Sequence, residues 1–105
     1  MRQRTWGWRL KREQVLQKLS RFQAEYGDDL GIVRMGVFGS VARDDGTRAG
    51  DVDVVVELED PDLLTLVAIK QELEALLEES VDIVRYRDRM NAYLKRRIEQ
   101  EAVYV

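Results

Sequence analysis

The sequence predicts an α/β (α+β) fold in which a small mixed β-sheet of three or more strands is flanked by helices. Two observations lead to this class. Three short runs rich in β-branched residues alternate with segments whose apolar residues recur at helical spacing. The length of 105 residues is that of one domain, which we expect to span residues 1–105.

The first predicted element is a helix over about residues 10–26, with Gly27 placed to end it. Its apolar residues at helical spacing are Val15, Leu16, Leu19 and Phe22, with Tyr26 one turn further on. These residues would form the face that packs on a sheet.

A strand is predicted over residues 32–38, and its alternation places Val33, Met35 and Val37 on one face. Gly39 and Ser40 interrupt the apolar run. We therefore expect a short helical turn over 40–43 and, because residues 44–50 are polar and contain two Gly, a loop after it.

The second half of the chain predicts two more strands and two more helices. Residues 52–58 are β-branched and continuous enough for a central strand. Asp60 and Pro61 predict a helix start, as N-cap and first helical residue, for a helix that runs to about residue 79. The apolar stripe of that helix is Leu63, Leu66, Val67, Leu73, Leu76 and Leu77. A third strand over 81–84 and a last helix over about 90–101 follow, and the last helix presents Met90, Leu94 and Ile98 on one face.

The composition excludes several kinds of chemistry, because the chain has no His and no Cys. Disulfides, thiolate nucleophiles, Cys-ligated zinc, Ser-His-Asp triads and imidazole acid–base catalysis are all ruled out. Any catalysis must use carboxylates, Lys or Arg, hydroxyls, backbone N–H groups and bound metal. No apolar run approaches the roughly 18 residues of a membrane span, so we expect a cytoplasmic protein without a membrane partner.

The charge is unevenly distributed around a net value of −3. Residues 41–82 contain thirteen acidic and three basic residues. Such an acidic segment repels a polyanion unless metal ions bridge the two, so a nucleic-acid partner is not expected. The N-terminus interleaves basic residues with Trp6 and Trp8, a pattern compatible with single-stranded nucleic acid or a partner protein. We favour a frayed terminus whose Trp side chains pack on the first helix.

Asp51 and Asp53 lie two residues apart at the start of the second strand. The period of two puts both carboxylates on one face, where each raises the pKa of the other. A divalent metal would reverse that repulsion, because hard cations prefer clustered carboxylate oxygens. The alternative is a solvated strand end or a capped loop.

Gly39 and Ser40 add an independent signal. A strand that runs into Gly-Ser and a helical turn directs backbone N–H groups and a hydroxyl to one point, which suits a phosphate. The alternative is an ordinary strand-to-helix turn with Ser40 as N-cap.

Asp82 interrupts the otherwise apolar third strand. If that strand lies beside residues 52–58, Asp82 can join Asp51 and Asp53 in one acidic cluster. Alternatively, it faces solvent on an edge strand, near Arg85.

Together, Gly39-Ser40, a gap of ten residues (41–50), the Asp51-x-Asp53 pair and Asp82 resemble the polymerase-beta-like nucleotidyltransferase superfamily. The small size, Ala42-Arg43 after Gly-Ser and the C-terminal run from Ile98 to Val105 resemble the minimal nucleotidyltransferase (MNT) antitoxins, which are encoded beside HEPN-domain ribonuclease toxins.

The resemblance implies transfer of AMP from ATP by a two-metal carboxylate mechanism. Asp51 and Asp53 would hold two Mg²⁺ ions, and Asp82 would complete the second metal's shell and help to deprotonate the attacking hydroxyl. Gly39 and Ser40 would hold the β- and γ-phosphates. Arg43 would support the phosphates or pair with an acidic residue of the following loop.

The resemblance also implies a HEPN toxin as partner, modified on a Tyr hydroxyl and thereby inactivated in a hetero-oligomeric complex. Two alternatives stay open: an antitoxin that neutralises by binding alone, and nucleotidyl transfer to a small molecule or an RNA end.

Overall fold

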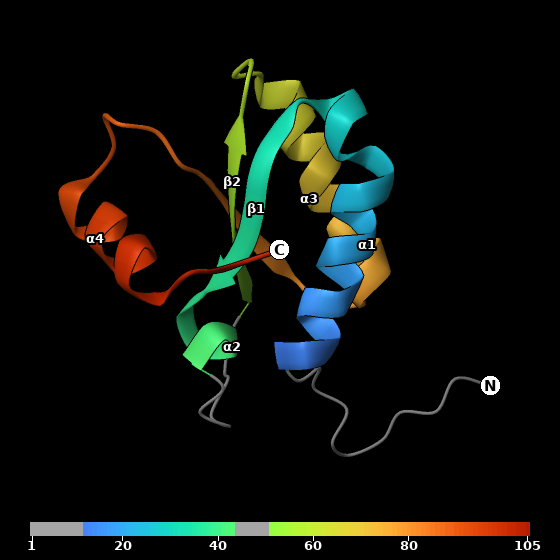
Figure 1. The fold of residues 1–105 in the computed structure, drawn as a ribbon, viewed down its shortest axis with the longest axis horizontal. Coiled ribbons are helices and arrows are strands. Elements are labelled where there is room, and N and C mark those ends of the chain that lie inside the picture. Colours follow the sequence, from blue (N-terminus) through green and yellow to red (C-terminus); the bar gives the residue numbers. More distant parts are fainter. Residues whose placement is uncertain (1–11, 44–50) are drawn as a thin grey trace.

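A computed structural model describes residues 12–43 and 51–105 of the chain (Figure 1). The elements follow one another as α1 (Arg12–Leu30), β1 (Ile32–Phe38), α2 (Gly39–Arg43), β2 (Val52–Leu58), α3 (Leu63–Leu77), β3 (Val81–Arg85), α4 (Ala92–Glu101) and β4 (Val103–Tyr104). This order confirms the predicted α/β class and adds a fourth strand that the sequence did not predict.

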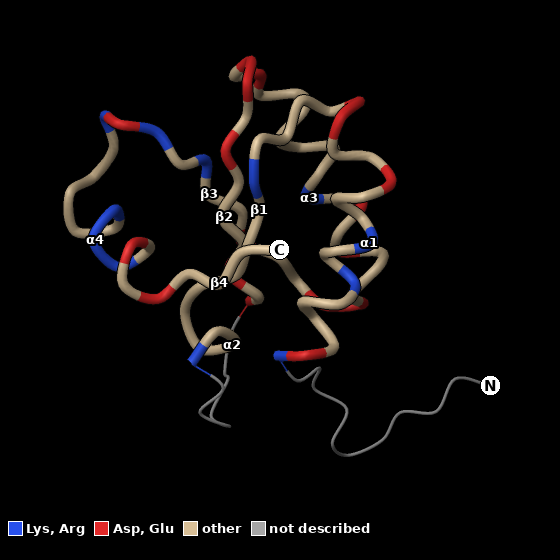
Figure 2. The backbone as a smooth tube through the Cα atoms, in the orientation of Figure 1, with Lys and Arg blue, Asp and Glu red and all other residues tan. Residues whose placement is uncertain are grey.

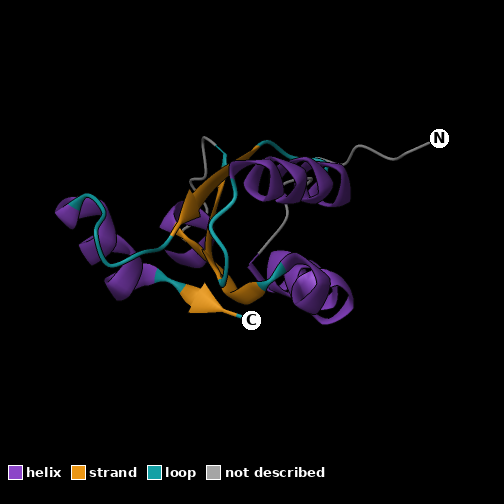
Figure 3. Cartoon of the chain, turned by 90° about the horizontal axis from the view of Figure 1, so that it is seen from above, coloured by secondary structure: helices purple, strands orange, loops and turns teal. Residues whose placement is uncertain are grey.

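The strands form one mixed sheet in the order β3-β2-β1-β4. β2 is parallel to β3, whereas β1 is antiparallel to both β2 and β4. The prediction of a central strand at residues 52–58 is therefore confirmed. Seen along the sheet, α1 and α3 cover one face and α4 lies on the other (Figure 3).

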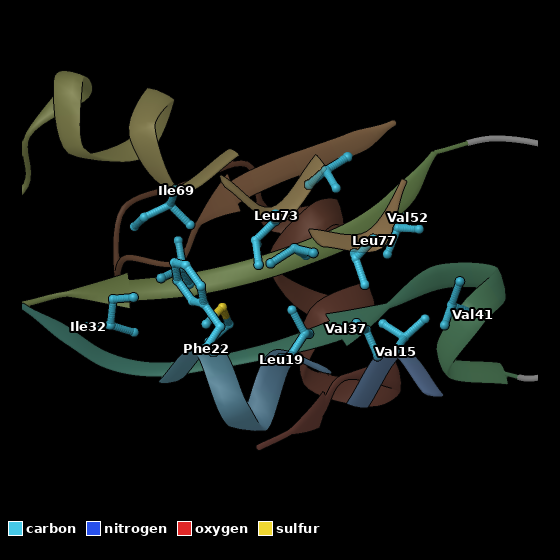
Figure 4. Packing of buried hydrophobic residues seen from close by; sticks show 14 of the residues in the cluster. Val15, Leu19, Phe22, Ile32, Val37, Val41, Val52, Ile69, Leu73 and Leu77 are labelled. Carbon is cyan, nitrogen blue, oxygen red and sulfur yellow. The ribbon is translucent and has the colours of Figure 1, made fainter. Parts of the chain in front are cut away.

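Two apolar clusters separate these layers. The larger one lies between the sheet and the α1–α3 pair, where Leu19, Ile69, Leu73 and Val37 are all fully buried (Figure 4). The smaller one lies under α4 and contains Phe38, Val55 and Ile98, with Met90 and Leu94 packed against it. The predicted apolar face of the last helix is thus confirmed at Leu94 and Ile98, whereas Met90 precedes the helix. β2 is buried on both of its faces.

The predicted end of the first helix is wrong. Gly27 is buried inside α1, and the helix continues to Leu30. Gly31 follows with φ of +70°, and its N–H donates to the carbonyl of Asp28. The positive φ that favours glycine at a helix end is therefore adopted four residues later than predicted.

The prediction that Val33 shares a face with Met35 and Val37 is also wrong, because the register shifts between Ile32 and Arg34. The resulting irregularity leaves the Val33 side chain 51% exposed, while Met35 and Val37 are fully buried. A bulge of this kind reverses the alternation locally, and a period of two cannot anticipate it.

The start of α3 lies later than predicted. Asp62, rather than Asp60, is the N-cap, and its side chain accepts from the N–H of Leu64, so Pro61 precedes the helix. The predicted apolar stripe is only partly buried. Leu73 and Leu77 are in the core, whereas the exposed members of the stripe are Leu63, Val67 and Leu76. Apolar residues occupy more of this helix's circumference than its neighbours cover.

β4 is a two-residue edge strand that pairs with Gly36 and Val37 in the second half of β1. Gly36 lies opposite Tyr104, and a Cβ at Gly36 would overlap the backbone of Val103. The absence of a side chain at Gly36 lets the C-terminal segment reach the sheet.

Two further expectations concern a membrane span and the residues outside the described ranges. No helix within residues 12–43 and 51–105 is long and apolar enough to cross a membrane. Trp6 and Trp8, expected to pack on the first helix, and the predicted loop 44–50 lie outside the described residues.

We predict that Gly36→Ala detaches β4 from β1, because the added Cβ meets backbone rather than a flexible side chain. The free energy of unfolding, measured by denaturant titration, should fall by about 1–3 kcal/mol. Val33→Ala, at an exposed position of the same strand, should change it by less than about 1 kcal/mol. Equal losses in both variants would contradict the close packing at Gly36.

Candidate functional site

The site begins where β1 ends. After Phe38 the chain enters the short helix α2 through Gly39, whose φ is +75°. A Cβ at Gly39 would overlap Oδ2 of Asp53. Both facts require glycine here: the backbone adopts a conformation that L side chains rarely take, and the space is filled by a carboxylate. Ser40 follows in the same turn and is half-buried.

The sheet register brings the predicted carboxylates to one place. Asp53 lies opposite Phe38 of β1 and beside Asp82 of β3. Neighbouring residues in register point to the same side of a sheet, so Asp53 and Asp82 share the face on which α4 lies. Asp51 immediately precedes β2. Asp53 is half-buried, whereas Asp51 and Asp82 are exposed.

Burial and like charges make Asp53 an unusual carboxylate. Loss of solvent raises its pKa above the ordinary value, and repulsion from Asp82 and Asp51 raises that pKa further. The guanidinium groups of Arg97 and Arg43 act in the opposite direction. The net shift of the pKa is upward, so the folded protein without a bound cation disfavours the charge on Asp53.

This donor set fits a hard divalent cation, which prefers carboxylate oxygens and would relieve the repulsion around Asp53. Within residues 12–43 and 51–105, however, no three His, Cys, Asp or Glu side chains are gathered into a ready cation cluster. Asp53 and Asp82 are adjacent in register, Asp53 is half-buried, and Asp51 and Asp82 are exposed.

The Gly39 amide is already hydrogen-bonded in the structure. Its N–H donates to Oε1 of Glu101, in the last turn of α4, with N and O 3.1 Å apart. The same oxygen lies 3.4 Å from Nη1 of Arg43 and 3.5 Å from Nη2 of Arg97. Arg43, expected to contact phosphate or to pair with the following loop, thus pairs with Glu101. Two cationic groups and one amide converge on a single carboxylate beside Asp53.

Arg97 and Glu101 were not among the predicted site residues. The guanidinium of Arg97 lies over the Phe38 ring, 5.6 Å from the centroid. The spacing of four residues places Arg97 and Glu101 on one helical face, where their side chains can form an ion pair. Only the packing of α4 on the sheet shows that this face meets Gly39. In Figure 2, the basic end of α2 and the acidic beginning of β2 lie at the same edge of the molecule.

Comparison with known proteins gives an independent assignment. Residues 13–105 match the family described as Nucleotidyltransferase domain. The chain is 32% identical over 94 residues to the protein adenylyltransferase MntA of Thermococcus cleftensis, covering 89% of this chain and 94% of that protein. A proposed protein adenylyltransferase of Methanocaldococcus jannaschii is 42% identical over 76 residues, which cover 71% of this chain and 81% of that protein.

Solved structures share the fold. A structure described as a minimal nucleotidyltransferase superposes with a TM-score of 0.71 at 33% identity, covering 90% of this chain and 95% of that one. The MNT antitoxin in a complex with the tri-AMPylated HEPN toxin of Shewanella oneidensis superposes with a TM-score of 0.64 at 19% identity, covering 89% and 70%. At that identity the second likeness supports the fold alone.

We predict that Gly39→Ala destabilises the protein more than Gly31→Ala. Both residues have positive φ, but a Cβ at Gly31 has its nearest neighbour 3.9 Å away, whereas one at Gly39 overlaps Asp53. Each variant should lose about 1–2 kcal/mol for the backbone conformation. The additional loss at Gly39, measured by denaturant titration, reports the contact with Asp53. A smaller loss at Gly39 than at Gly31 would contradict that contact.

We also predict that Asp53→Asn stabilises the protein in the absence of metal and nucleotide. The raised pKa means that the folded state binds a proton at Asp53 more tightly than the unfolded state does. The stability associated with protonated Asp53 is therefore present at low pH and is lost as the pH rises through the raised pKa.

At pH 7 the melting temperature of Asp53→Asn should exceed that of the parent by a few degrees. The difference should shrink as the pH approaches about 4, where Asp53 is increasingly protonated even in the unfolded chain. Asp51→Asn, at an exposed position, serves as the comparison and should have a smaller effect. A melting temperature for Asp53→Asn below that of the parent at pH 7 would refute the prediction.

Proposed function

The chain belongs to the nucleotidyltransferase domain family, and we propose that it transfers AMP from ATP to a Tyr hydroxyl of a partner HEPN ribonuclease toxin. The observation that carries this proposal is the convergence of Asp53, Asp82 and the Gly39 turn at one edge of the sheet. The acidic pair would bind the cation of a cation–triphosphate complex. The adjacent Gly39 turn, which has no side chain, would bind the phosphates.

The choice of a protein as acceptor is supported by the relatives. The match with the Thermococcus cleftensis protein adenylyltransferase extends over 94% of that protein, so the likeness is not confined to a shared nucleotide-binding fragment. A structural neighbour is an MNT antitoxin bound to an AMPylated HEPN toxin, and another toxin–antitoxin neighbour was solved with AMP-PNP. A cytoplasmic toxin–antitoxin pair is the setting in which such a reaction would occur.

The residues divide the work between metal and phosphate. Asp51, Asp53 and Asp82 would hold two Mg²⁺ ions, which supply neutralisation of the triphosphate and of the leaving pyrophosphate when bound. The Gly39 amide and the Ser40 hydroxyl would donate to the β- and γ-phosphates, with support from Arg43.

The transfer itself would be an in-line displacement. The Tyr oxygen forms a bond to the α-phosphorus, and the bond from that phosphorus to pyrophosphate breaks. Asp82, exposed and beside Asp53, would accept the proton of the attacking hydroxyl. No imidazole is needed, because positioning and charge neutralisation account for most of the catalysis of such transfers.

Two other functions compete with this one. An antitoxin that only occludes its toxin would need no nucleotide, and a transferase acting on a small molecule or an RNA end would need another acceptor. The half-buried Asp53 beside Asp82 favours catalysis, because a surface used only for binding gains nothing from a carboxylate in a repulsive position.

We predict that the wild-type protein, incubated with ATP, Mg²⁺ and the HEPN protein encoded by the adjacent gene, increases the mass of that protein by one or more AMP units. Asp51→Asn and Asp53→Asn should each lower the rate at least about 100-fold, because each removes a carboxylate charge from the proposed metal site. Intact-mass spectrometry follows the transfer, and removal of Mg²⁺ with a chelator should stop it.

Asp60→Asn is the matched control, because Asp60 is exposed and follows the opposite end of β2. It should transfer AMP at the parent rate. Tight binding of the HEPN protein with no change in its mass would contradict the proposed transferase and support an antitoxin that acts by occlusion alone. Full transfer by the double variant of Asp51 and Asp53 would overturn the assignment of these residues.

A further inference from the structure

Glu101 lies among donors that suit a phosphate. Its Oε1 accepts from the Gly39 amide at 3.1 Å and lies within ion-pair distance of Arg43 and Arg97, at 3.4 Å and 3.5 Å. One backbone N–H and two guanidinium groups on one anionic oxygen form a set of charge-assisted contacts typical of phosphate oxygens. Glu101 is separated from Gly39 by 62 positions, so only the packing of α4 brings the carboxylate there.

We propose that Glu101 occupies a phosphate subsite of the nucleotide-free protein, and that the triphosphate displaces it and binds Arg97 in its place. This inference rests on the proposed nucleotidyl transfer and extends it in two ways. It adds Arg97 to the groups that bind nucleotide, and it makes Glu101 a competitor for the Gly39 amide that the phosphates would use.

The burial of the three side chains permits this exchange. Glu101 retains 22% of its side-chain exposure and Arg97 retains 33%, so both border solvent rather than lie in the core. Arg43, at 47%, is more open still. A rotation of the Glu101 side chain at the end of α4 would release the Gly39 N–H without unfolding the helix.

Two other neighbours of Arg97 position its guanidinium near the proposed phosphate subsite. Its guanidinium lies over the ring of Phe38, the residue opposite Asp53. It is also close enough to Asp53 to lower the pKa of that carboxyl. The guanidinium of Arg97 is therefore close to both Asp53, at which a metal would bind, and Glu101, which would yield its place to a phosphate.

The chain provides matched controls on the same helix. Arg96 is exposed and adjacent to Arg97. Glu99 is exposed, and its carboxylate accepts from the Tyr86 hydroxyl instead of the Gly39 amide. Substitutions at Arg96 and Glu99 change the helix charge by the same amount as those at Arg97 and Glu101.

The test measures equilibrium binding of AMP-PNP with Mg²⁺, and of inorganic tripolyphosphate, by calorimetry on the full chain. Glu101→Gln should bind both probes about tenfold more tightly than the parent, because it removes a competing charge. Arg97→Gln should bind both about tenfold more weakly, and Arg97→Lys should retain part of the affinity. Glu99→Gln and Arg96→Gln should differ from the parent by less than about threefold. Melting temperatures without ligand confirm that every variant is folded.

Unchanged or weaker binding by Glu101→Gln would overturn the competition, and unchanged binding by Arg97→Gln would overturn the role of Arg97. If no variant binds either probe, the phosphate subsite itself is refuted. These outcomes are separate from those of the transfer reaction. Tighter binding by Glu101→Gln, together with no AMP transfer by the parent, would support the subsite and contradict the proposed transferase.

Discussion

The contact between the Gly39 backbone and the Asp53 carboxylate is the constraint on which the site depends. It fixes where the strand β1 can turn into α2, because only a residue without a side chain leaves room for the carboxylate. It also fixes which face of β2 carries the chemistry, since Asp53 points toward α4 while its neighbours Val52 and Val54 are buried under α1 and α3. The direction of the Gly39 amide and the position of the acidic pair are therefore set by one close approach.

That arrangement has a thermodynamic consequence. Asp53 is placed where burial and two other carboxylates raise its pKa, so the charged form of this side chain is disfavoured in the protein without a cation. The surrounding fold supplies the compensation, because β2 lies between two strands and is buried by apolar residues on both faces. A local cost at the site is tolerated since the central strand is held by the rest of the sheet.

Much of the fold follows from sequence patterns, because strands and helices of this length differ clearly in apolar period. The strand over 32–38, the central strand over 52–58 and the order of elements are as predicted. The errors have physical reasons. A glycine such as Gly27 can be accommodated inside a helix, a bulge exposes Val33, and a two-residue strand such as β4 is too short for a period. The side-by-side placement of Asp53 and Asp82 could be stated only conditionally, since the parallel pairing of β2 with β3 is a property of the tertiary fold.

The residues missed by sequence reasoning lie where distant segments meet, and their charges explain why they belong to the site. Asp53 needs positive charge nearby, and Arg97 and Arg43 provide it. These two cations in turn contact Glu101, so the protein alone already balances its charges internally. A metal–triphosphate complex carries the same pair of charges in one ligand, a cation suited to Asp53 and anionic oxygens suited to the partners of Glu101. Binding of the complex would then replace the contacts between Glu101 and the two Arg side chains by contacts with phosphate oxygens. Asp53 would gain the metal ion as its counter-charge. That exchange requires the two charge clusters to be neighbours, which the packing of α4 against the end of β1 achieves.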